Sequence, residues 1–360
     1  MKFAASNVPR LDMRIPHRNW TKAINEAFAL LLMALPGEVI CITGPSRAGK
    51  SCLISELSRQ LVGDGDFTVT GKMPVVTVEA VNAGPNGTFS TKAFIHRMLE
   101  SVKHPIFGVG ESDGYDHLGT LKLERATEST LRLALERAFK YRGTKYLFID
   151  EAQHAQYASK NSQAPCAVMD SWKCLAQTAG LVLIVVGAYP ILKILRNSPH
   201  LLGRKRQVHL PRYHSSNEDL REFAKIVQVY QKALLPLLGG NSLLEHTKFL
   251  HRGSWGCIGL LRAWLSHAAT LASLREVCID IELLEHAVLS DSDLSEISHE
   301  ITEGEYLLQS SAEKLGAISE HQLSDGVDSA KGPKKKGASK PFQRKPKRNL
   351  IGNRSEGAKS

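Results

Sequence analysis

The sequence contains two recurring hydrophobic patterns. Short, continuous apolar runs occur in the first two thirds of the chain, separated by segments whose apolar residues are three or four positions apart. Continuous apolar runs are typical of parallel strands, because helices cover both faces of a parallel sheet. The predicted strands lie at residues 38–43, 75–81, 146–149, 181–186 and 208–210. The pattern therefore predicts an α/β core with a parallel sheet between helices.

Helical periodicity predicts the remaining elements. Core helices are expected at residues 19–35, 51–61, 91–102, 124–141 and 169–179. After about residue 216 only helical patterns remain, at residues 219–235, 258–274 and 281–289. We therefore expect an N-terminal segment over residues 1–17, an α/β core over residues 18–215 and a small all-helical domain over residues 216–290.

Charge divides the remainder of the chain. Residues 282–330 hold 12 acidic side chains and one basic one, whereas residues 331–360 hold 11 basic side chains and one acidic one. Apolar residues at helical intervals predict an acidic helical extension over residues 291–330, weakened by Gly304 and either solvated or partner-binding. The Pro- and Gly-containing tail over residues 331–360 is expected to be disordered, as a DNA arm, a docking peptide or a solubiliser.

Composition excludes several classes of protein. The 360 residues are 42% hydrophobic, which suits a globular chain, and the longest apolar stretches are shorter than the ~20 residues of a membrane-spanning helix. The six cysteines form no C-x-x-C pair, so a zinc ribbon or disulfide framework is not expected. The first residues lack the apolar region of a secretory signal. We expect a cytoplasmic protein with no membrane partner.

The strongest local motif follows the first predicted strand. Gly44, Gly49, Lys50 and Ser51 match the phosphate-loop pattern G-x-x-x-x-G-K-[ST], and a predicted helix begins directly after it. In this setting backbone amides and the helix N-terminus face phosphate oxygens. Lys50 is expected to reach the β- and γ-phosphates of ATP, and the Ser51 hydroxyl is expected to ligate Mg²⁺. The predicted nucleotide contacts are Gly44, Pro45, Ser46, Arg47, Ala48, Gly49, Lys50, Ser51 and Cys52.

A second motif ends the strand at residues 146–149. Asp150 and Glu151 follow four apolar or aromatic residues, which is where a phosphate-loop enzyme places its acidic metal ligand. Asp150 is expected to bind Mg²⁺ through water. Glu151 is the candidate base that polarises the attacking water, since this role requires a carboxylate near the γ-phosphate.

The run Asp-Glu-Ala-Gln-His at residues 150–154, about 100 residues after Lys50, resembles the TniB/TnsC family of AAA+ ATPases, which regulate DNA transposition and are related to MuB. Further similarity lies at residues 74–80, 90–99, 202–213 and 253–262. The resemblance spans roughly residues 16–290. It implies an AAA+ phosphate-loop core followed by a helical lid.

The resemblance also implies a function and partners. The protein would be a prokaryotic ATPase that oligomerises on double-stranded DNA, marks a target site and recruits or activates a DDE-type transposase, alongside a target selector of the TniQ type. ATP binding would promote assembly as a ring or helical filament, and slow hydrolysis would promote release. An arginine finger from one subunit, Arg204 or alternatively Arg206, would complete the ATP site of its neighbour.

Two departures from the AAA+ pattern predict slow hydrolysis that DNA or a partner stimulates. The strand at residues 181–186 is followed by Gly-Ala-Tyr-Pro, without the polar residue that usually helps to orient water. Gly259 stands where related lid helices carry an arginine, and Arg262 lies one turn later. ATP is therefore expected to act mainly as an assembly switch.

Residues 1–281 hold 34 basic and 23 acidic side chains, a balance compatible with binding DNA phosphates. The candidate DNA contacts are Lys92, Lys103, Lys122 and Arg125. No sequence-reading motif is present, so sequence-tolerant binding of duplex DNA is expected. Two alternatives stay open: a helicase-loader-like or secretion-associated AAA+ ATPase, and a nucleotide-gated signalling scaffold.

Overall fold

A computed structural model describes residues 11–63, 67–84, 87–108, 125–159, 163–197 and 205–323. The chain divides into two compact units, residues 1–310 and 311–360. Of the second unit, the structure describes only the continuation of one helix to Leu323. The predicted Lys122, Arg204 and basic tail lie outside the described residues.

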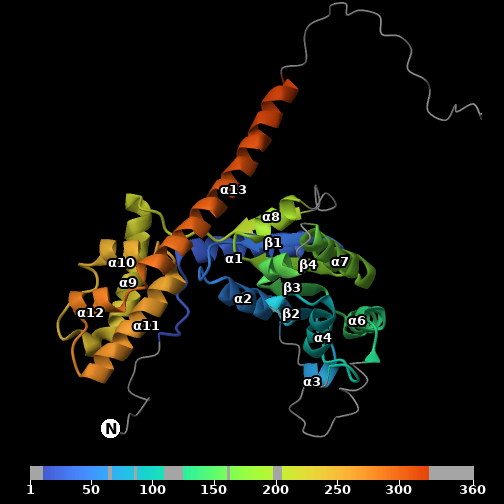
Figure 1. Ribbon diagram of the computed structural model, residues 1–360, viewed down its shortest axis with the longest axis horizontal. Helices are drawn as coiled ribbons and strands as arrows, with labels where there is room; N and C mark the ends of the chain where they lie inside the picture. The colour runs from blue at the N-terminus through green and yellow to red at the C-terminus, as the bar shows by residue number, and fades with distance from the viewer. Residues whose placement is uncertain are drawn as a thin grey trace, which may run out of the picture. The chain divides into compact units, whose positions relative to one another are not determined.

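A five-stranded parallel sheet forms the core of the first unit (Figure 1). Its strand order is β2-β3-β4-β1-β5, and every neighbouring pair is parallel. The strands are β1 (Val39–Thr43), β2 (Val75–Glu79), β3 (Tyr146–Asp150), β4 (Val182–Gly187) and β5 (Lys205–His209). The predicted parallel sheet between helices is confirmed.

Helices cover both faces of this sheet. Ile40 and Ile42 of β1 pack with α1 (Arg18–Met33) and α2 (Lys50–Val62). Val39 and Cys41 point into the opposite cluster, because side chains alternate between the faces of a strand. That cluster is covered by α4 (Thr91–Ser101), α6 (Glu128–Arg142) and α7 (Ala164–Ala179). Strands that are buried on both sides explain the unbroken apolar runs.

The hydrophobic pattern missed several short elements. Four of them have seven residues or fewer: α3 (Phe67–Thr70), η4 (Ala152–Tyr157), α8 (Ile191–Arg196) and α10 (Thr247–Gly253). Such elements span too few turns for periodicity to emerge. The last strand begins at residue 205 rather than the predicted 208, because β5 is an edge strand and its first residues are polar.

A helical region follows the sheet (Figure 1). It consists of α9 (Asn217–Leu238), α10, α11 (Ile258–Arg275) and α12 (Ile281–Ala287). Phe223, Tyr230 and Leu265 lie in its core, together with Leu11 from the N-terminal segment. Of the helices in the described part of the chain, none alone has the length and apolar character to cross a membrane, whereas the bent pair α10 and α11 meets that test together.

The acidic segment forms one continuous helix, α13 (Asp291–Leu323). The predicted weak point at Gly304 is instead a point of close contact. A Cβ at Gly304 would lie 2.0 Å from the Tyr189 ring, so a larger residue could not occupy this position without moving the helix. Ile301, one turn earlier, is only 1% exposed and belongs to the hydrophobic cluster that α4, α6 and α7 cover. Glycine lowers the intrinsic stability of the helix, and the contacts of α13 with the core compensate for this loss.

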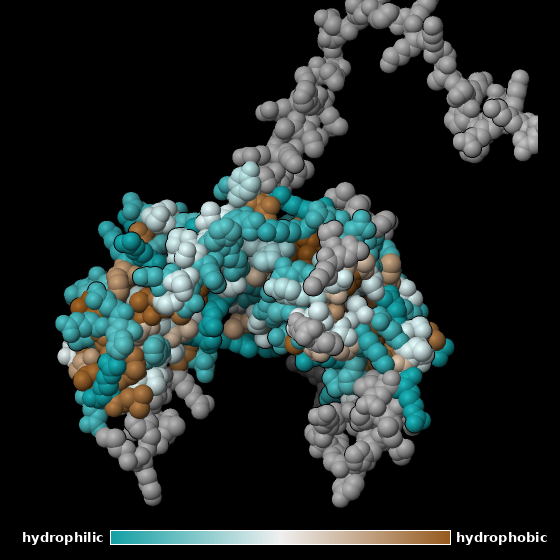
Figure 2. Space-filling view, viewed as in Figure 1, coloured by the Kyte–Doolittle hydropathy of each residue, from teal (hydrophilic) through white to brown (hydrophobic). Residues whose placement is uncertain are grey.

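On the face shown in Figure 2, hydrophobic residues are scattered in small groups among hydrophilic ones. Scattered apolar residues are usual on protein surfaces. The exposed apolar side chains that adjoin in sequence include Leu32, Met33 and Leu35, each at least 64% exposed at the end of α1.

His209 at the end of β5 makes stability depend on pH. Its Nε2 lies 3.0 Å from the Tyr189 hydroxyl, and burial lowers the pKa of His209 from 6.5 to about 4, with Glu305 opposing and His214 adding to this shift. A depressed pKa in the folded state stabilises the fold above the unfolded pKa. We therefore expect the wild type to lose about 1–2 kcal/mol through this group as pH falls from 7 to 5.

The variant His209→Gln lacks this titration and keeps a polar side chain. Thermal unfolding of both proteins between pH 7 and pH 5 should show a steeper loss in the wild type. Parallel curves for the two proteins would contradict the assignment.

Candidate nucleotide site

The phosphate-loop motif forms a tight turn between β1 and α2. Gly49 has φ +101° and Arg47 has φ +59°, so the chain passes twice through the left-handed region. Gly44 meets a different constraint, because a Cβ there would lie 2.4 Å from the carbonyl oxygen of Leu210. The glycines thus allow the loop to fold compactly beside the end of β5.

Lys50 lies inside this turn. Its ammonium donates hydrogen bonds to the carbonyl oxygens of Gly44 and Pro45 at 3.2 and 2.8 Å, and the residue is 6% exposed. Burial lowers the pKa of Lys50, and the nearby carboxylates of Glu151, Glu300 and Asp150 oppose that shift. Among the described residues, the hydrogen-bond partners of this buried cation are two neutral carbonyls, which suits an anionic ligand such as phosphate.

The two predicted metal ligands lie together. Ser51 Oγ donates a hydrogen bond to Asp150 Oδ2 at 2.8 Å, although the residues are 99 positions apart. Burial raises the pKa of Asp150, while the hydrogen bonds from Ser51 and from the Glu151 amide oppose this effect. A hydroxyl and a carboxylate are the oxygen ligands that Mg²⁺ accepts, with phosphate and water oxygens as the rest.

The N-terminus of α2 also fits a nucleotide. Gly49 occupies its N-cap position, and no side chain caps the helix. Free amides at a helix N-terminus bind phosphate oxygens. Within the described ranges no group of three or more His, Cys, Asp or Glu side chains is arranged to hold a metal. Mg²⁺ at Ser51 and Asp150 would therefore depend on ligands from the nucleotide.

The sequence did not indicate a role for Gln153. Its side-chain amide donates a hydrogen bond to Glu151 Oε2 and accepts one from the Ala188 amide at 3.1 Å. Gly187 makes room for it, because a Cβ there would lie 2.4 Å from Gln153 Oε1. Gln153 thus brings a polar side chain to the end of β4, where the sequence lacks one. Glu151 itself directly follows β3 and has φ +51°.

The lid helix α11 touches the phosphate loop directly. The Gly259 amide donates a hydrogen bond to the Arg47 carbonyl oxygen at 2.9 Å, and a Cβ at Gly259 would lie 2.2 Å from that oxygen. This close approach explains why no arginine stands at this position. Arg262, one turn later, instead pairs with Asp12 at 3.3 Å.

Of the two candidate arginine fingers, the structure describes Arg206. It lies on the edge strand β5, 42% exposed, and its guanidinium is 3.9 Å from a carboxylate oxygen of Glu38. Arg206 pairs in register with Ile40, three residues before the end of β1. It therefore does not approach the phosphate loop of its own chain, as is required of a residue that acts on a neighbour.

The three candidate DNA contacts that the structure describes fall at two edges of the sheet. A hydrogen bond of 2.9 Å from Thr91 to Glu128 joins the beginnings of α4 and α6, which places Lys92 and Arg125 at the same end. Lys103 follows the other end of α4, about 16 Å away by helical rise. Lys103 shares this end with three more exposed lysines. The basic edge consists of Lys72, Lys103, Lys140 and Lys145.

Arg142 and aromatic rings organise the basic edge. The Arg142 guanidinium donates hydrogen bonds to the carbonyl oxygens of Gly71 and Lys103, at 3.1 and 2.8 Å. The Lys103 ammonium lies 4.4 Å from the centre of the Phe67 ring. These contacts tie the end of α4 to the segment that precedes β2.

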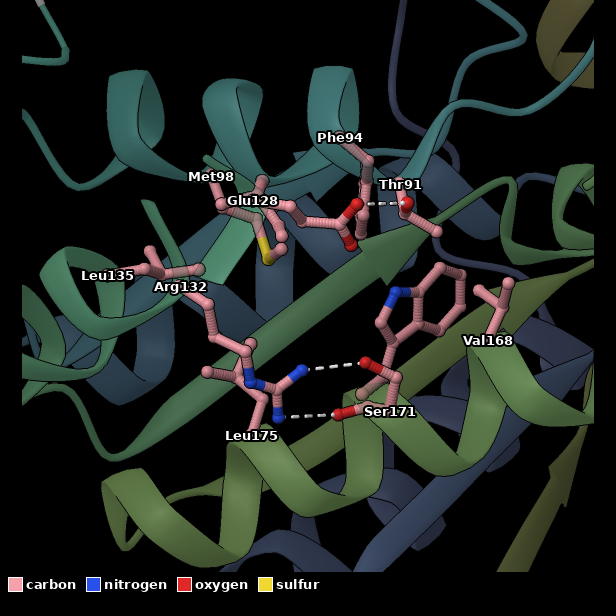
Figure 3. A pocket seen from close by; sticks show the side chains of 11 residues that line it. Thr91, Phe94, Met98, Glu128, Arg132, Leu135, Val168, Ser171 and Leu175 are labelled. Carbon is pink, nitrogen blue, oxygen red and sulfur yellow. Dashed lines mark hydrogen bonds between the residues drawn. The ribbon is translucent and has the colours of Figure 1, made fainter. Parts of the chain in front are cut away.

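A pocket between α4, α6 and α7 is not the nucleotide site (Figure 3). The cavity has a volume of about 20 Å³, which is room for roughly one water molecule. Figure 3 shows Arg132 donating to the hydroxyl and carbonyl oxygens of Ser171, at 2.6 and 3.1 Å. These bonds hold the helices together beside Trp172.

Comparison with known proteins agrees with this geometry. Residues 36–195 match the family described as an AAA domain. No curated protein matches the sequence significantly.

Solved structures give further matches. The ORC2 protein of Aeropyrum pernix, in its ADPNP and ADP complexes, shares 15% identity and a TM-score of 0.51 over 78% of this chain and 68% of that chain. The Walker-type ATPase of Pyrococcus abyssi is 13% identical, with a TM-score of 0.49 over 87% of this chain and 79% of that one. For Cdc6p from Pyrobaculum aerophilum the values are 14%, 0.49, 79% and 69%.

The fold is therefore the AAA+ phosphate-loop fold, with a C-terminal helical region. The protein is an ATPase with an AAA domain over residues 36–195.

The contacts of Gln153 predict a specific kinetic effect. Gln153→Ala removes the group that holds Glu151, so we expect the single-turnover rate of ATP hydrolysis to fall about tenfold or more. ATP affinity should change less than about twofold, because these two side-chain hydrogen bonds of Gln153 go to Glu151 and Ala188 and not to the phosphate loop. Rapid-quench hydrolysis and equilibrium titration with a fluorescent ATP analogue measure the two quantities.

A double variant distinguishes a role of Gln153 in placing an amide beside Glu151 from a role in the stability of the fold. Gln153→Ala with Gly187→Asn places an amide on β4 itself and should recover part of the rate. A merely structural role for Gln153 predicts instead a lower melting temperature and no recovery.

Proposed function

We propose that this chain is an ATP-dependent regulator of DNA transposition of the TniB/TnsC type, which assembles on double-stranded DNA and recruits or activates a transposase. The resemblance at residues 150–154 and the surrounding segments supports this proposal. Nucleotide would bind at the phosphate loop, with Lys50 on the phosphates, Ser51 and Asp150 at Mg²⁺, and Glu151 polarising water. The ADPNP and ADP complexes of the ORC2 protein, which has the same fold, are consistent with such binding.

The observation that carries the switching function is the contact between the lid and the phosphate loop. The Arg47 carbonyl oxygen accepts a hydrogen bond from Gly259 at the start of α11. Any movement of residue 47 when phosphates bind would therefore act on the lid helix. Arg47 has a left-handed backbone, a conformation that is uncommon for residues other than glycine and that often marks functional turns. The loop and the lid would change together.

Two surface features support assembly on DNA. The basic edge has four exposed lysines, and Arg142 fixes the backbone at Lys103 by a hydrogen bond. Such a positively charged surface would suit the phosphates of a duplex. Leu32, Met33 and Leu35 form a small apolar group that a neighbouring subunit would cover. Arg204 or Arg206 would then reach the ATP site of that neighbour. A DDE-type transposase and a TniQ-type target selector are the proposed partners.

Slow hydrolysis follows from the same site. Strand β4 ends without a polar residue of its own to help orient water, and Gly259 stands where related lid helices carry an arginine. Contact with DNA or with a partner subunit would adjust this arrangement and raise the rate. ATP binding would then promote assembly, and hydrolysis would promote release.

The DNA proposal predicts a strong dependence on salt. We expect ATP-dependent assembly on random-sequence duplex DNA, with an affinity that falls steeply as salt rises. Lys72→Glu with Lys103→Glu should weaken DNA binding at least about tenfold and lower the salt slope by about two, because each lysine would neutralise one phosphate. Fluorescence anisotropy with labelled duplexes at several salt concentrations measures both.

Charge-matched controls complete this experiment. Lys22→Glu with Lys248→Glu makes the same change of charge at exposed positions away from the basic edge and should leave the slope unchanged. Equal effects of the two double variants would remove the basic edge from the proposal. A preference for single-stranded DNA or for a helicase would favour the helicase-loader alternative. Nucleotide-dependent assembly with no DNA binding would favour the scaffold alternative.

A further inference from the structure

A carboxylate of the acidic helix lies on the phosphate loop. The Ser46 hydroxyl, in the middle of the loop, is 2.9 and 3.1 Å from the two carboxylate oxygens of Glu300. The residues are 254 positions apart, so the contact depends entirely on the way α13 packs. Glu300 therefore places a negative charge at a loop whose glycines, lysine and helix N-terminus suit an anion.

Several further contacts hold this part of α13 in place. Both carboxylate oxygens of Glu305 accept hydrogen bonds from Arg212, at 2.8 and 3.1 Å, and this pair is largely shielded from solvent. Glu303 pairs with Lys193 at 2.7 Å. The carbonyl oxygen of Leu307 accepts a hydrogen bond from Arg196. The polar contacts thus run from Glu300, directly before the buried Ile301, to Leu307, almost two turns after it.

The centre of this contact is apolar and tight. Ile301 is 1% exposed, and Ile297, Leu307 and Leu308 pack against the same cluster. Gly304 allows the helix backbone to lie directly on the ring of Tyr189. Burial of these side chains and the charged pairs around them stabilise the docked helix.

The charged residues of α13 and of the nucleotide site affect the same buried residue, Cys257. Cys257, at the start of the lid helix, is 1% exposed, and burial raises its pKa to about 12. Lys50 and Arg212 oppose this shift, whereas Glu300 and Glu305 add to it. The acidic side chains and the phosphate-binding lysine thus influence one buried thiol. A triphosphate entering this space would meet the repulsion of Glu300.

We propose that residues 297–308 of α13 form an autoinhibitory strap, in which Glu300 occupies the phosphate loop until ATP displaces it. This inference rests on the proposed nucleotide role of the loop. With the strap docked, the fraction of molecules competent to bind ATP is small, and the apparent dissociation constant rises in inverse proportion to that fraction. Binding of ATP releases the helix, which frees Arg212, Lys193 and Arg196 for another acidic partner.

Two variants of the full chain release the strap by different means. Gly304→Ala adds a Cβ that would lie 2.0 Å from the Tyr189 ring, while alanine strengthens the helix itself. Glu300→Gln keeps the size of the side chain and removes its charge. Each should lower the apparent dissociation constant for a fluorescent ATP analogue at least about threefold. Glu296→Gln, on an exposed part of the same helix, is the matched control and should leave affinity unchanged.

Hydrogen exchange gives a readout that does not depend on affinity. Backbone amides at residues 297–308 should exchange faster in Gly304→Ala, and faster in the wild type when the ATP analogue is added. Unchanged affinity in both variants, or stronger protection of this segment with the analogue, would overturn the strap. If the wild type and both variants fail to bind the analogue, the nucleotide function fails as well. Binding by the variants alone would support the strap.

Discussion

The hydrogen bond from Ser51 to Asp150 joins the two halves of the nucleotide site, and the rest of the structure depends on the register that allows it. Strand β4 lies between β1 and β3, pairing Thr43 with Gly187 and Ile149 with Val185. Because all three strands are parallel, their carboxyl ends meet at one edge of the sheet. The phosphate loop, the acidic pair and the end of β4 are therefore neighbours, and the lid and α13 approach the same place.

The parts of this arrangement that the sequence could predict are those with a local signal. Unbroken apolar runs identified the central strands β1, β3 and β4, because these strands are buried on both faces. The phosphate-loop motif and the acidic pair were recognisable because their chemistry requires given residue types at fixed spacing, directly after a strand. The predicted nucleotide residues and the predicted acids do come together in space. Their catalytic roles stay predictions, since geometry alone places them without showing turnover.

The parts that the sequence could not supply depend on contacts between distant segments. Gln153 reaches the end of β4 only because Gly187 leaves room there, and neither residue alone signals this. No polar residue follows β4 in the sequence, but the Gln153 side chain occupies that place in the structure. The pattern likewise placed the start of β5 too late, because an edge strand carries polar side chains. Of the four candidate DNA contacts, Lys103 belongs to an organised basic edge, whereas Lys92 lies at the opposite end of its helix.

Three glycines mark where other segments come close to the phosphate loop. Gly44 approaches the end of β5, Gly259 brings the lid helix to Arg47, and Gly304 lets α13 lie on Tyr189, which follows β4. In the sequence, Gly304 indicates only a weak point in a helix. In the structure, the same glycine permits the close contact between α13 and the Tyr189 ring. At each of these glycines, a Cβ would clash with the neighbouring segment. The three segments are therefore closely packed around the loop. A ligand that moved the loop would act on the lid through Arg47 and on α13 through Ser46, and this packing is what would convert phosphate binding into a change of surface.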